Sequence, residues 1–432
     1  MVFLAPYFAL RGWRRGEPSG AFRERLGGLP PEIIARAVKT ASPSDGPIWI
    51  HAVSVGEVLA ARPLAEGLKR RFEHRAVFVS TTTETGQRLA RERLDFVDGV
   101  FYFPLDWIVP VRRALRAIRP ALVIVMETEI WPNFLREARR QGASVIFANA
   151  RISEKSFARF KTWDFLVGPF YERVLADANL FLAQTLEDAS RLSEMGASEG
   201  RVEVAGNLKY DSEQPEMSRF GIWLEGQVKR QERWPVLVAG SIVAGEEEAV
   251  LAAYDLVQRR WRRALLVLAP RKPDRFDAAT EIAASGGWNV VRRTHVDLEA
   301  PLDENADVLV LDSIGELAGL YRLADAVFVG GSLIPAGGHN ILEPAWFAKP
   351  PVFGPSMENF RDMAAQFLKS RAAVQVTSGQ QLGKVWIQLI EDKKLGESMG
   401  RAALEISELN RGAAARSLDR IAAALAKKEP FA

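Results

Sequence analysis

Short apolar runs alternate with longer amphipathic stretches along the first half of the chain. Continuous runs of Val, Ile, Leu and Phe are typical of strands that are buried on both faces of a parallel sheet. The stretches between them, for example 56–71 and 85–93, have the apolar spacing of helices. We therefore expect a parallel α/β sheet with the strands PIWIHAVS (47–54), AVFVSTTT (76–83), VFYFP (100–104), ALVIVM (121–126), SVIFAN (144–149) and NLFLAQ (179–184).

A second series of the same kind begins at Pro235. Two series in 432 residues predict two Rossmann-like domains. The polar segment DSEQPEMS (211–218) lies between the two series. We expect an N-terminal domain at 1–211, a hinge at 212–233 and a C-terminal domain at 234–432, whose last helix is able to pack back on the first domain. The strands expected in the second series are PVLVAG (235–240), ALLVLAP (264–270), WNVVRR (288–293), DVLVLD (307–312) and AVFV (326–329).

Acidic residues lie where the first series predicts the carboxyl ends of strands, the usual place for ligands in such sheets. Glu57 follows the first strand, and Glu127 follows ALVIVM, with Glu129 two residues later. Neighbouring carboxylates raise the pKa of one of them, as a general base near neutral pH requires. Glu57 also has a purely structural alternative, because Ser54 to Glu57 has the spacing of a capping box, in which the glutamate only accepts a backbone N–H. Either of the other two acids can also pair with Arg151 and only shape its loop.

A glycine-rich stretch, GGSLIPAGGHNILEPA (330–345), follows the last strand of the second series. Glycines ahead of a helix N-terminus let backbone N–H groups approach a phosphate closely. Asn340 would cap a short helix expected at 342–348, and Glu343 suits either the helix dipole or a ribose hydroxyl. The alternative is a tight turn and a capped helix that bind nothing.

Composition narrows the class of protein. With 48% hydrophobic and 26% charged residues the chain is globular, and it has no cysteine, so it has neither disulfides nor thiolate metal sites. Lys+Arg 57 against Asp+Glu 54 gives a net charge of +3, which does not suggest a nucleic-acid binder. Four scattered histidines and the lack of any Asp-x-Asp pair give no sign of a metal site.

The first fifteen residues form a local feature. Met1–Leu10 is apolar, and Arg11, Arg14 and Arg15 follow around Trp13. Ten apolar residues are too few to span a bilayer. An apolar segment flanked by arginines can lie in a membrane interface or pack on the domain as a first helix. Because Arg23 and Arg25 would add to a cationic edge suited to an anionic lipid, we expect a short membrane-interface segment.

Six motifs in order carry a resemblance to a known family: HAVSVGEVLAARPL (51–64), VMETEIWPN (125–133), ANARIS (148–153), GNLKYD (206–211), LAPRKPDRF (268–276) and the glycine-rich stretch. Together they resemble the 3-deoxy-D-manno-octulosonic acid (Kdo) transferases of lipopolysaccharide synthesis. The resemblance implies a GT-B fold, in which two Rossmann-like domains with parallel sheets face a central cleft. It also implies an inverting enzyme that transfers Kdo from CMP-Kdo to a lipid A precursor, without metal or cofactor, at the cytoplasmic face of the inner membrane.

The resemblance further implies roles for single residues. Glu57 matches the general base, Glu127 supports the base or the transition state, and Lys209 stabilises the departing phosphate. Many relatives carry a His where this chain has Val243, so a phosphate contact there is lost or replaced. The residues expected to bind CMP and its phosphate are Ser241, Pro270, Arg271, Ile314, Gly315, Glu316, Leu317, Gly337, Gly338, His339, Asn340, Ile341, Leu342 and Glu343.

Two other functions fit the same pattern of domains. A nucleotide-sugar 2-epimerase can share this fold, accepts a UDP-sugar and needs no lipid. A non-catalytic sugar-nucleotide binder is a further alternative, although it gives no reason for the set Glu57, Glu127, Lys209 and Arg271. The motifs do not encode how many Kdo units are added, which acyl pattern the acceptor has, or the oligomeric state.

Overall fold

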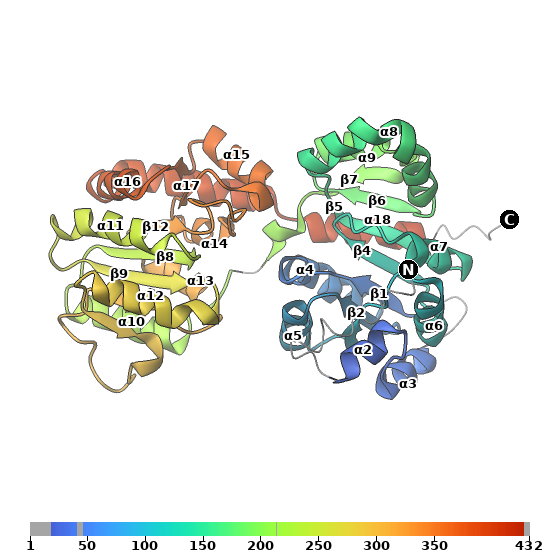
Figure 1. Cartoon of the computed structure of the whole chain (residues 1–432), viewed down its shortest axis with the longest axis horizontal. Helices are drawn as coiled ribbons and strands as arrows, with labels where there is room; N and C mark the ends of the chain where they lie inside the picture. The colour runs from blue at the N-terminus through green and yellow to red at the C-terminus, as the bar shows by residue number, and fades with distance from the viewer. Residues whose placement is uncertain (1–18, 41–45, 213, 427–432) are drawn as a thin grey trace. The chain divides into compact units, whose positions relative to one another are not determined.

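The computed structural model describes residues 19–40, 46–212 and 214–426. Within these ranges the chain folds into two compact units (Figure 1). One unit contains the residues up to 212 together with those from 410 onward, and the other contains 214–409. The segment Met1–Arg15, expected to lie in a membrane interface or to pack as a helix, is outside the described residues.

The first unit is built on a sheet of seven parallel strands in the order β3-β2-β1-β4-β5-β6-β7. The apolar runs form these strands because each buries side chains on both faces. Trp49 packs against Phe101 and Phe134 on one face, and its neighbours Ile48 and Ile50 lie in the core on the other. The strands are β1 (Ile48–His51), β2 (Val77–Thr81), β3 (Gly99–Tyr102), β4 (Leu122–Met126), β5 (Ser144–Ala150), β6 (Leu180–Ala183) and β7 (Val202–Val204).

Helices cover both faces of this sheet. The last of them, α18, comes from the C-terminal end of the chain and packs against α4, where Leu418 lies on Gly67. The helices are α2 (Ser19–Arg25), α3 (Pro31–Thr40), α4 (Val55–Arg71), α5 (Glu84–Arg93), α6 (Ile108–Ile118), α7 (Pro132–Arg140), α8 (Glu154–Leu175), α9 (Leu186–Glu194) and α18 (Ala413–Ala426), with the 3₁₀ turns η2 (Glu199–Arg201) and η3 (Leu208–Asp211).

The second unit repeats the plan with seven parallel strands in the order β10-β11-β9-β8-β12-β13-β14. Trp386 is fully buried in its core, and the indole N–H donates to the carbonyl oxygen of Val327 over 3.0 Å, so this large side chain leaves no polar atom unsatisfied. The strands are β8 (Val236–Ile242), β9 (Leu265–Pro270), β10 (Val290–Arg292), β11 (Val308–Val310), β12 (Ala326–Val329), β13 (Val352–Phe353) and β14 (Val374–Gln375). The helices and turns are α10 (Arg219–Arg230), α11 (Glu247–Gln258), η4 (Pro273–Arg275), α12 (Phe276–Ser285), η5 (Arg293–His295), α13 (Leu317–Leu320), η6 (Tyr321–Leu323), α14 (Leu342–Ala345), η7 (Glu358–Phe360), α15 (Arg361–Lys369), α16 (Gly379–Glu391) and α17 (Lys393–Leu409).

The range 212–233, expected as a hinge, contains the helix α10. The polar segment before it suggested an open linker, but Phe220 and Leu224 follow at helical spacing and are buried in the core of the second unit. The second unit therefore includes 214–233. It ends at 409, because α18 belongs to the first unit.

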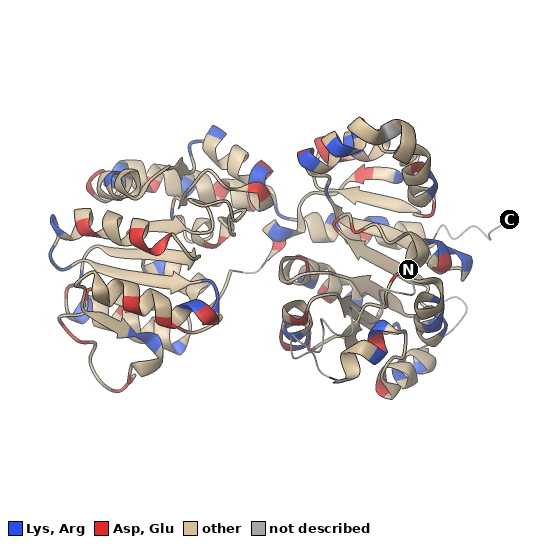
Figure 2. Cartoon of the chain, in the orientation of Figure 1, with Lys and Arg blue, Asp and Glu red and all other residues tan. Residues whose placement is uncertain are grey.

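Each sheet has one point where the chain changes the side on which it adds strands. In the first sheet this point lies between β1 and β4, and in the second it lies between β8 and β12. Ligands of open parallel sheets bind outside the carboxyl ends of the strands at such a point. Figure 2 shows that the central strands carry almost no charge, so the acidic and basic residues that follow them stand out.

None of the helices within the described residues is both long and apolar enough to cross a membrane.

Candidate functional site

Glu57 lies at the start of α4, directly after the carboxyl end of β1. Its side chain is only 7% exposed. Burial, together with the negative charges of Glu127 and Glu129, raises the pKa of Glu57 to about 7, although hydrogen bonds partly oppose the shift. A carboxylate with this pKa can accept a proton near neutral pH, which is the property a general base requires.

The hydrogen bonds of Glu57 differ from those of a capping box. In that motif the serine accepts a bond from the helix backbone and the glutamate accepts one from the serine's own N–H. Here the Ser54 hydroxyl donates to Glu57 Oε1 over 3.0 Å, and the N–H of Val53 donates to Oε2 over 2.8 Å. Ser54 makes no side-chain cap bond to the helix backbone. The local contacts therefore hold the carboxylate in place more than they cap the helix.

Glu127 follows β4, the neighbour of β1, and has a left-handed backbone with φ 53°. A non-glycine residue in this conformation is uncommon and marks a position fixed by its surroundings. Its N–H donates to Ala148 O over 2.9 Å, and its carboxylate lies 3.5 Å from Lys209 Nζ. Lys209, from η3, is therefore a cation beside Glu127.

Two tight contacts fix the loops that carry these groups. The N–H of Arg151 donates to Thr128 Oγ1 over 2.9 Å, which ties the loop after β4 to the loop after β5. Asn149, which also has positive φ, accepts a bond from the N–H of Leu208 over 2.9 Å. The main chain next to Lys209 is thereby joined to the end of β5. The loop after β5 is thus bonded to both of the others, through Thr128 on one side and Leu208 on the other.

Glu129 contributes through its charge. Burial, and then the charge of Glu127, raises its pKa. Three carboxylates thus act on one another at one edge of the first sheet, and Lys209 supplies the positive charge beside them. The histidine of the same motif has a different role: the ring of His51 is fully buried and stacks on Phe103 at 3.8 Å, and burial lowers its pKa to about 3.

In the second unit, backbone N–H groups of the expected phosphate loop are bonded to a side chain of the chain itself. Glu246 is fully buried, and its carboxylate accepts bonds from the N–H groups of Gly331, Ser332 and Leu333, over 2.6, 2.9 and 2.8 Å, and from Val243 over 3.1 Å. Glycines at this position were expected to present N–H groups to a phosphate. In the first glycine pair, however, the N–H of Gly331 bonds to this carboxylate and that of Gly330 donates to Gly240 O over 2.8 Å.

The turn after β8 is filled in a similar way. The N–H of Gly245 donates to Glu247 Oε2 over 2.8 Å, so it is not directed at an external anion. Ser241 has φ 57° and redirects the chain at the end of β8. Glu246 was not among the predicted residues, although the sequence contains a signal for it: three consecutive glutamates, Glu246 to Glu248, open a helix just after the end of a strand.

Arg271, His339 and Glu343 form the charged part of the second unit's site. Burial and the charge of Arg271 lower the pKa of His339 to about 4, whereas burial raises the pKa of Glu343 to about 7 against the effect of Arg271. Arg271 follows β9, is exposed, and its backbone N–H donates to Ile242 O over 2.8 Å. It makes no ion pair with any described residue, so its guanidinium is available to an anion.

The N–H groups of the second glycine pair are also bonded within the chain: Gly337 donates to Ser356 Oγ over 2.9 Å and Gly338 to Gly331 O over 2.7 Å. The ring of His339 lies where a side chain on Gly331 would be, at 2.7 Å from that position. Asn340 accepts the N–H of Leu342 over 3.1 Å, and its amide lies 3.5 Å from Glu343. Asn340 thus bonds to the first residue of α14, whose N-cap position is held by Ile341, and α14 ends at Ala345 and not at 348.

Part of the segment 314–317, expected to bind CMP, is engaged in contacts within the chain. Glu316 accepts two bonds from Arg293, over 2.9 and 3.1 Å, so its carboxylate is paired. Gly315 has φ 92°, which only glycine adopts without strain, and Ile314 is 69% exposed beside it. The turn 314–317 thus offers an exposed apolar side chain and backbone groups, and Glu316 holds it in place.

The structure therefore brings the predicted residues together in two groups, each at the carboxyl edge of its own sheet. Glu57, Glu127 and Lys209 form one group, and Arg271, His339, Asn340 and Glu343 form the other. Within the described ranges, no cluster of three or more His, Asp or Glu side chains is arranged to hold a metal ion.

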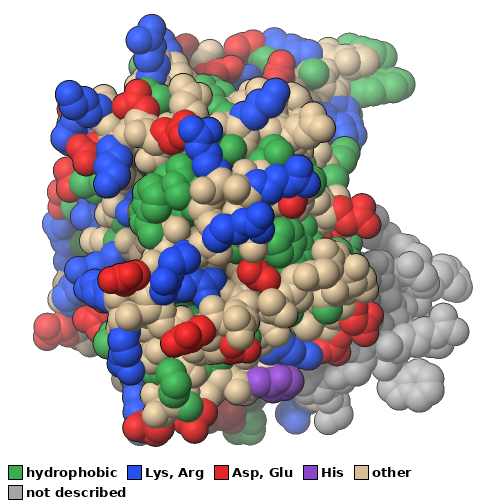
Figure 3. All heavy atoms as spheres, turned by 90° about the vertical axis from the view of Figure 1, so that its left-hand side faces the viewer, with side chains coloured by type: hydrophobic (Ala, Val, Ile, Leu, Met, Phe, Trp, Pro, Cys, Tyr) green, Lys and Arg blue, Asp and Glu red, His purple; other side chains and the backbone are tan. Residues whose placement is uncertain are grey.

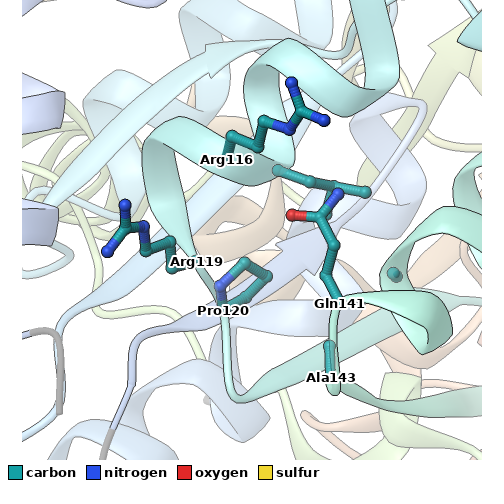
Figure 4. Close-up of a pocket in the computed structure, with 7 residues that line it drawn as sticks. Arg116, Arg119, Pro120, Gln141 and Ala143 are labelled. Carbon is teal, nitrogen blue, oxygen red and sulfur yellow. The ribbon is translucent and has the colours of Figure 1, made fainter. Parts of the chain in front are cut away.

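A cavity of about 290 Å³ lies elsewhere in the first unit (Figure 4). It is lined by residues that end α6 and α7 or precede β4 and β5, so it is at the amino edge of the sheet, away from Glu57. The residues that line the cavity are Leu115, Arg116, Arg119, Pro120, Ala138, Gln141 and Ala143. We assign it no part in the site, because it contains no acidic group and lies opposite the strand ends that carry the charged residues.

Comparisons with known proteins agree with this arrangement. The family described as 3-deoxy-D-manno-octulosonic-acid transferase matches residues 20–212. The 3-deoxy-D-manno-octulosonic acid transferase of Bordetella pertussis is 33% identical over 427 residues, 96% of each chain. That of Haemophilus influenzae is 32% identical over 375 residues, 86% of each chain.

Among solved structures, the UDP-GlcNAc 2-epimerase from Neisseria meningitidis bound to UDP-GlcNAc has a TM-score of 0.56 at 14% identity, over 88% of this chain and 99% of that one. At this identity the likeness concerns the fold alone. It confirms the expected GT-B fold class, with two α/β units that each contain a parallel sheet.

Proposed function

The chain belongs to the Kdo transferase family, and from this premise we propose that it transfers Kdo from CMP-Kdo to a lipid A precursor with inversion at the anomeric carbon. The observation that carries the proposal is the buried Glu57 carboxylate, whose pKa of about 7 suits proton transfer at the carboxyl edge of the first sheet. The epimerase and the non-catalytic binder are less favoured alternatives, because a Kdo transferase is 33% identical to the chain over nearly its whole length.

In this reaction the first unit activates the acceptor. Glu57 accepts the proton of an acceptor hydroxyl while that oxygen bonds to the anomeric carbon of Kdo, and the bond from that carbon to the phosphate oxygen of CMP breaks. A single displacement of this kind inverts the anomeric centre. Lys209 Nζ lies 3.5 Å from the Glu127 carboxylate, and the charge of Glu127 contributes to the raised pKa of Glu57.

The second unit binds the donor. Departure of CMP leaves charge on its phosphate, and the exposed Arg271 guanidinium can stabilise it with paired hydrogen bonds. Kdo itself carries a carboxylate that suits the same kind of group. Glu343, whose carboxylate lies 3.5 Å from the Asn340 amide, is the proposed partner of a ribose hydroxyl.

No metal has a part in the proposed mechanism. The chain lacks an Asp-x-Asp pair, and Arg271 supplies the positive charge that a divalent cation gives in many sugar transferases. Activity should therefore persist in excess chelator, and dependence on added magnesium would contradict this part of the proposal. We also propose that the protein works at the cytoplasmic face of the inner membrane, where an acceptor of this kind resides.

Mass spectrometry of the product made from CMP-Kdo and a lipid A precursor tests the proposal directly. The expected result is an acceptor heavier by one or more Kdo residues. Calorimetry with CMP and UDP tests the epimerase alternative, because tighter binding of UDP would favour it. Absence of product under conditions where CMP binds would favour the non-catalytic alternative.

Arg271→Ala should weaken CMP binding about 10- to 150-fold, because one charge-assisted contact is worth about 1.5–3 kcal/mol. The matched control is Lys272→Ala, which removes an exposed cation from the next position and should change CMP affinity little. Isothermal calorimetry on the full chain measures both. Equal losses in the two variants would show that only the general positive charge of the loop matters.

A further inference from the structure

The longest helix within the described residues, α8, leaves large apolar side chains in solvent. Trp163 is 52% exposed, Phe165 77%, Leu166 61% and Phe170 51%. Single exposed apolar residues are common, but neighbouring ones on one element mark an interaction surface. The opposite side of α8 packs on the first unit, where Phe160 is buried in the hydrophobic core.

Six exposed residues recur along α8 at intervals of three or four, so they share one side of the helix. Three apolar residues form the middle of this row, and cations stand at both of its ends. No described residue forms an ion pair with these cations, whereas Lys161, on an adjacent side, pairs with Glu194 at 2.8 Å. We name this row the α8 stripe: Lys155, Arg159, Trp163, Leu166, Phe170 and Arg173.

The stripe begins close to the site in the chain. α8 follows the carboxyl end of β5, where the N–H of Arg151 bonds to Thr128 in the loop that also carries Glu127. The first residue of the stripe is four positions after Arg151. Figure 1 shows α8 beside α9 on the outside of the first unit, next to β6 and β7. By contrast, the face of the second unit in Figure 3 mixes acidic and basic side chains with small apolar patches.

We propose that the α8 stripe lies flat on an anionic lipid bilayer and holds the first unit at the surface from which the acceptor is taken. The choice of a lipid partner rests on the proposed function. Tryptophan and phenylalanine prefer the boundary between headgroups and acyl chains, and helices with such a face lie in the plane of that boundary. Cations at both ends of the stripe attract the anionic headgroups around it.

A second copy of the chain is a poorer partner for this surface. Pairing two stripes in antiparallel fashion brings Arg173 of each copy toward Lys155 and Arg159 of the other. Parallel pairing sets each cation against its own counterpart. Both arrangements place like charges together around the apolar centre, which opposes association. A bilayer of anionic lipids meets the apolar centre and both charged ends at once.

Co-sedimentation of the full chain with vesicles of phosphatidylglycerol and phosphatidylcholine tests the proposal. The triple variant Trp163→Ser, Leu166→Ser, Phe170→Ser should bind at least about tenfold more weakly, because its interfacial side chains are lost. The control is Val109→Ser with Leu186→Ser, which removes apolar residues that are 75% and 81% exposed elsewhere in the same unit. The control should bind like the parent, and equal binding by the triple variant would overturn the proposal.

The charged ends are tested separately. Lys155→Gln, Arg159→Gln and Arg173→Gln should each weaken binding about fivefold at low salt, and the difference from the parent should shrink as salt is added. The triple serine variant should lose binding at every salt concentration. If neither set of variants changes vesicle binding, another part of the chain holds the membrane.

A fluorescent label identifies what covers the stripe. The chain has no cysteine, so Trp163→Cys takes a single environment-sensitive dye. The expected result is a blue shift only when anionic vesicles are added. A blue shift without vesicles that grows with protein concentration would identify a second copy. A blue shift that is present without vesicles and disappears when residues 1–15 are deleted would show that the chain's own N-terminal segment covers the stripe. Either result would overturn the proposal.

These measurements do not depend on transfer activity, because vesicle binding is measured without CMP-Kdo. If the vesicle results are as expected but no Kdo is transferred, the proposed function fails and the membrane surface stands. If Kdo is transferred to a water-soluble, deacylated acceptor equally by parent and serine variant, while only the parent works efficiently on acceptor in vesicles, both proposals are supported.

Discussion

Glu57→Gln is expected to lower turnover by about 10²- to 10⁴-fold while the protein stays folded and binds CMP as before, since this range is the usual contribution of general base catalysis. Glutamine keeps the size of the side chain. Its carbonyl oxygen can still accept the N–H of Val53, which now bonds to Glu57 over 2.8 Å, and its amide can donate to the Ser54 hydroxyl. It cannot accept the acceptor's proton. Single-turnover assays with CMP-Kdo measure the effect.

The matched control is Glu129→Gln, which removes one of the neighbouring charges and leaves the base. Its effect should be milder. It lowers the negative potential around Glu57, so the pKa of Glu57 should fall somewhat. Near-normal transfer by a folded Glu57→Gln protein would refute the assignment, and Glu127 would become the candidate base.

The pKa of Glu57 also predicts two opposite dependences on pH. Transfer should increase with pH up to about 7 and then level off, because the base works in its ionised form. Stability should change in the other direction. A carboxyl group whose pKa is higher in the folded state than the usual 4.5 favours folding below pH 4.5, and this contribution is lost as pH rises through about 7. Glu57→Gln removes that loss, so the Tm of the variant should exceed that of the parent more at pH 8 than at pH 5.

Glu246→Ala is expected to destabilise the second unit by about 3–5 kcal/mol, among the largest effects a single substitution has. The alanine leaves four backbone N–H groups, those of Val243, Gly331, Ser332 and Leu333, without their acceptor. Each unsatisfied buried donor costs about 1–3 kcal/mol, and water entering the space offsets part of the sum. Chemical denaturation, followed by a probe in the second unit, measures the change.

Glu246→Gln sharpens this test. An amide has one oxygen, so its NH₂ group must face two of the backbone donors, and the variant should be nearly as unstable as the alanine. Glu248→Ala is the control, because Glu248 is exposed on the same helix and should change stability by no more than about 0.5 kcal/mol. A glutamine variant as stable as the parent would show that the carboxylate is not the acceptor for this loop.

The apolar runs predicted most of the sheet strands because each run is buried on both faces and leaves little choice of structure. ALVIVM became β4 and ALLVLAP became β9 with only small changes at their ends. The helix α10 was not predicted, because the polar segment 211–218 ahead of it led to the prediction of a hinge over 212–233. Its burial depends on Phe220 meeting a sheet that is distant in sequence, and no local pattern contains that information.

The candidate site was predicted to a similar degree. Glu57 and Glu127 follow strands that turn out to be neighbours, and the order of strands in a sheet follows from the chain's path and not from any single motif. The partner of Glu127 could not be predicted, because Lys209 arrives from a turn some 80 residues later. For Glu246 the difficulty was a different one. The glycine-rich stretch was recognised, but its N–H groups were expected to bind a ligand, and the protein's own carboxylate accepts these bonds.

The path of α18 makes the first unit a host and the second unit a guest inserted into it. Residues 214–409 contain all of β8 to β14, and the host's sequence resumes at 410 to supply the helix that lies on Gly67 of α4. Cutting the chain once near 213 does not separate the units, since the fragment that carries the guest also carries a piece of the host's core, including Ala413 and Ile421. A shortened protein that ends at 409 would keep the guest whole but leave the host's apolar surface open to water. A swap of the guest for that of a relative should therefore retain α18, so that the core of the host stays complete.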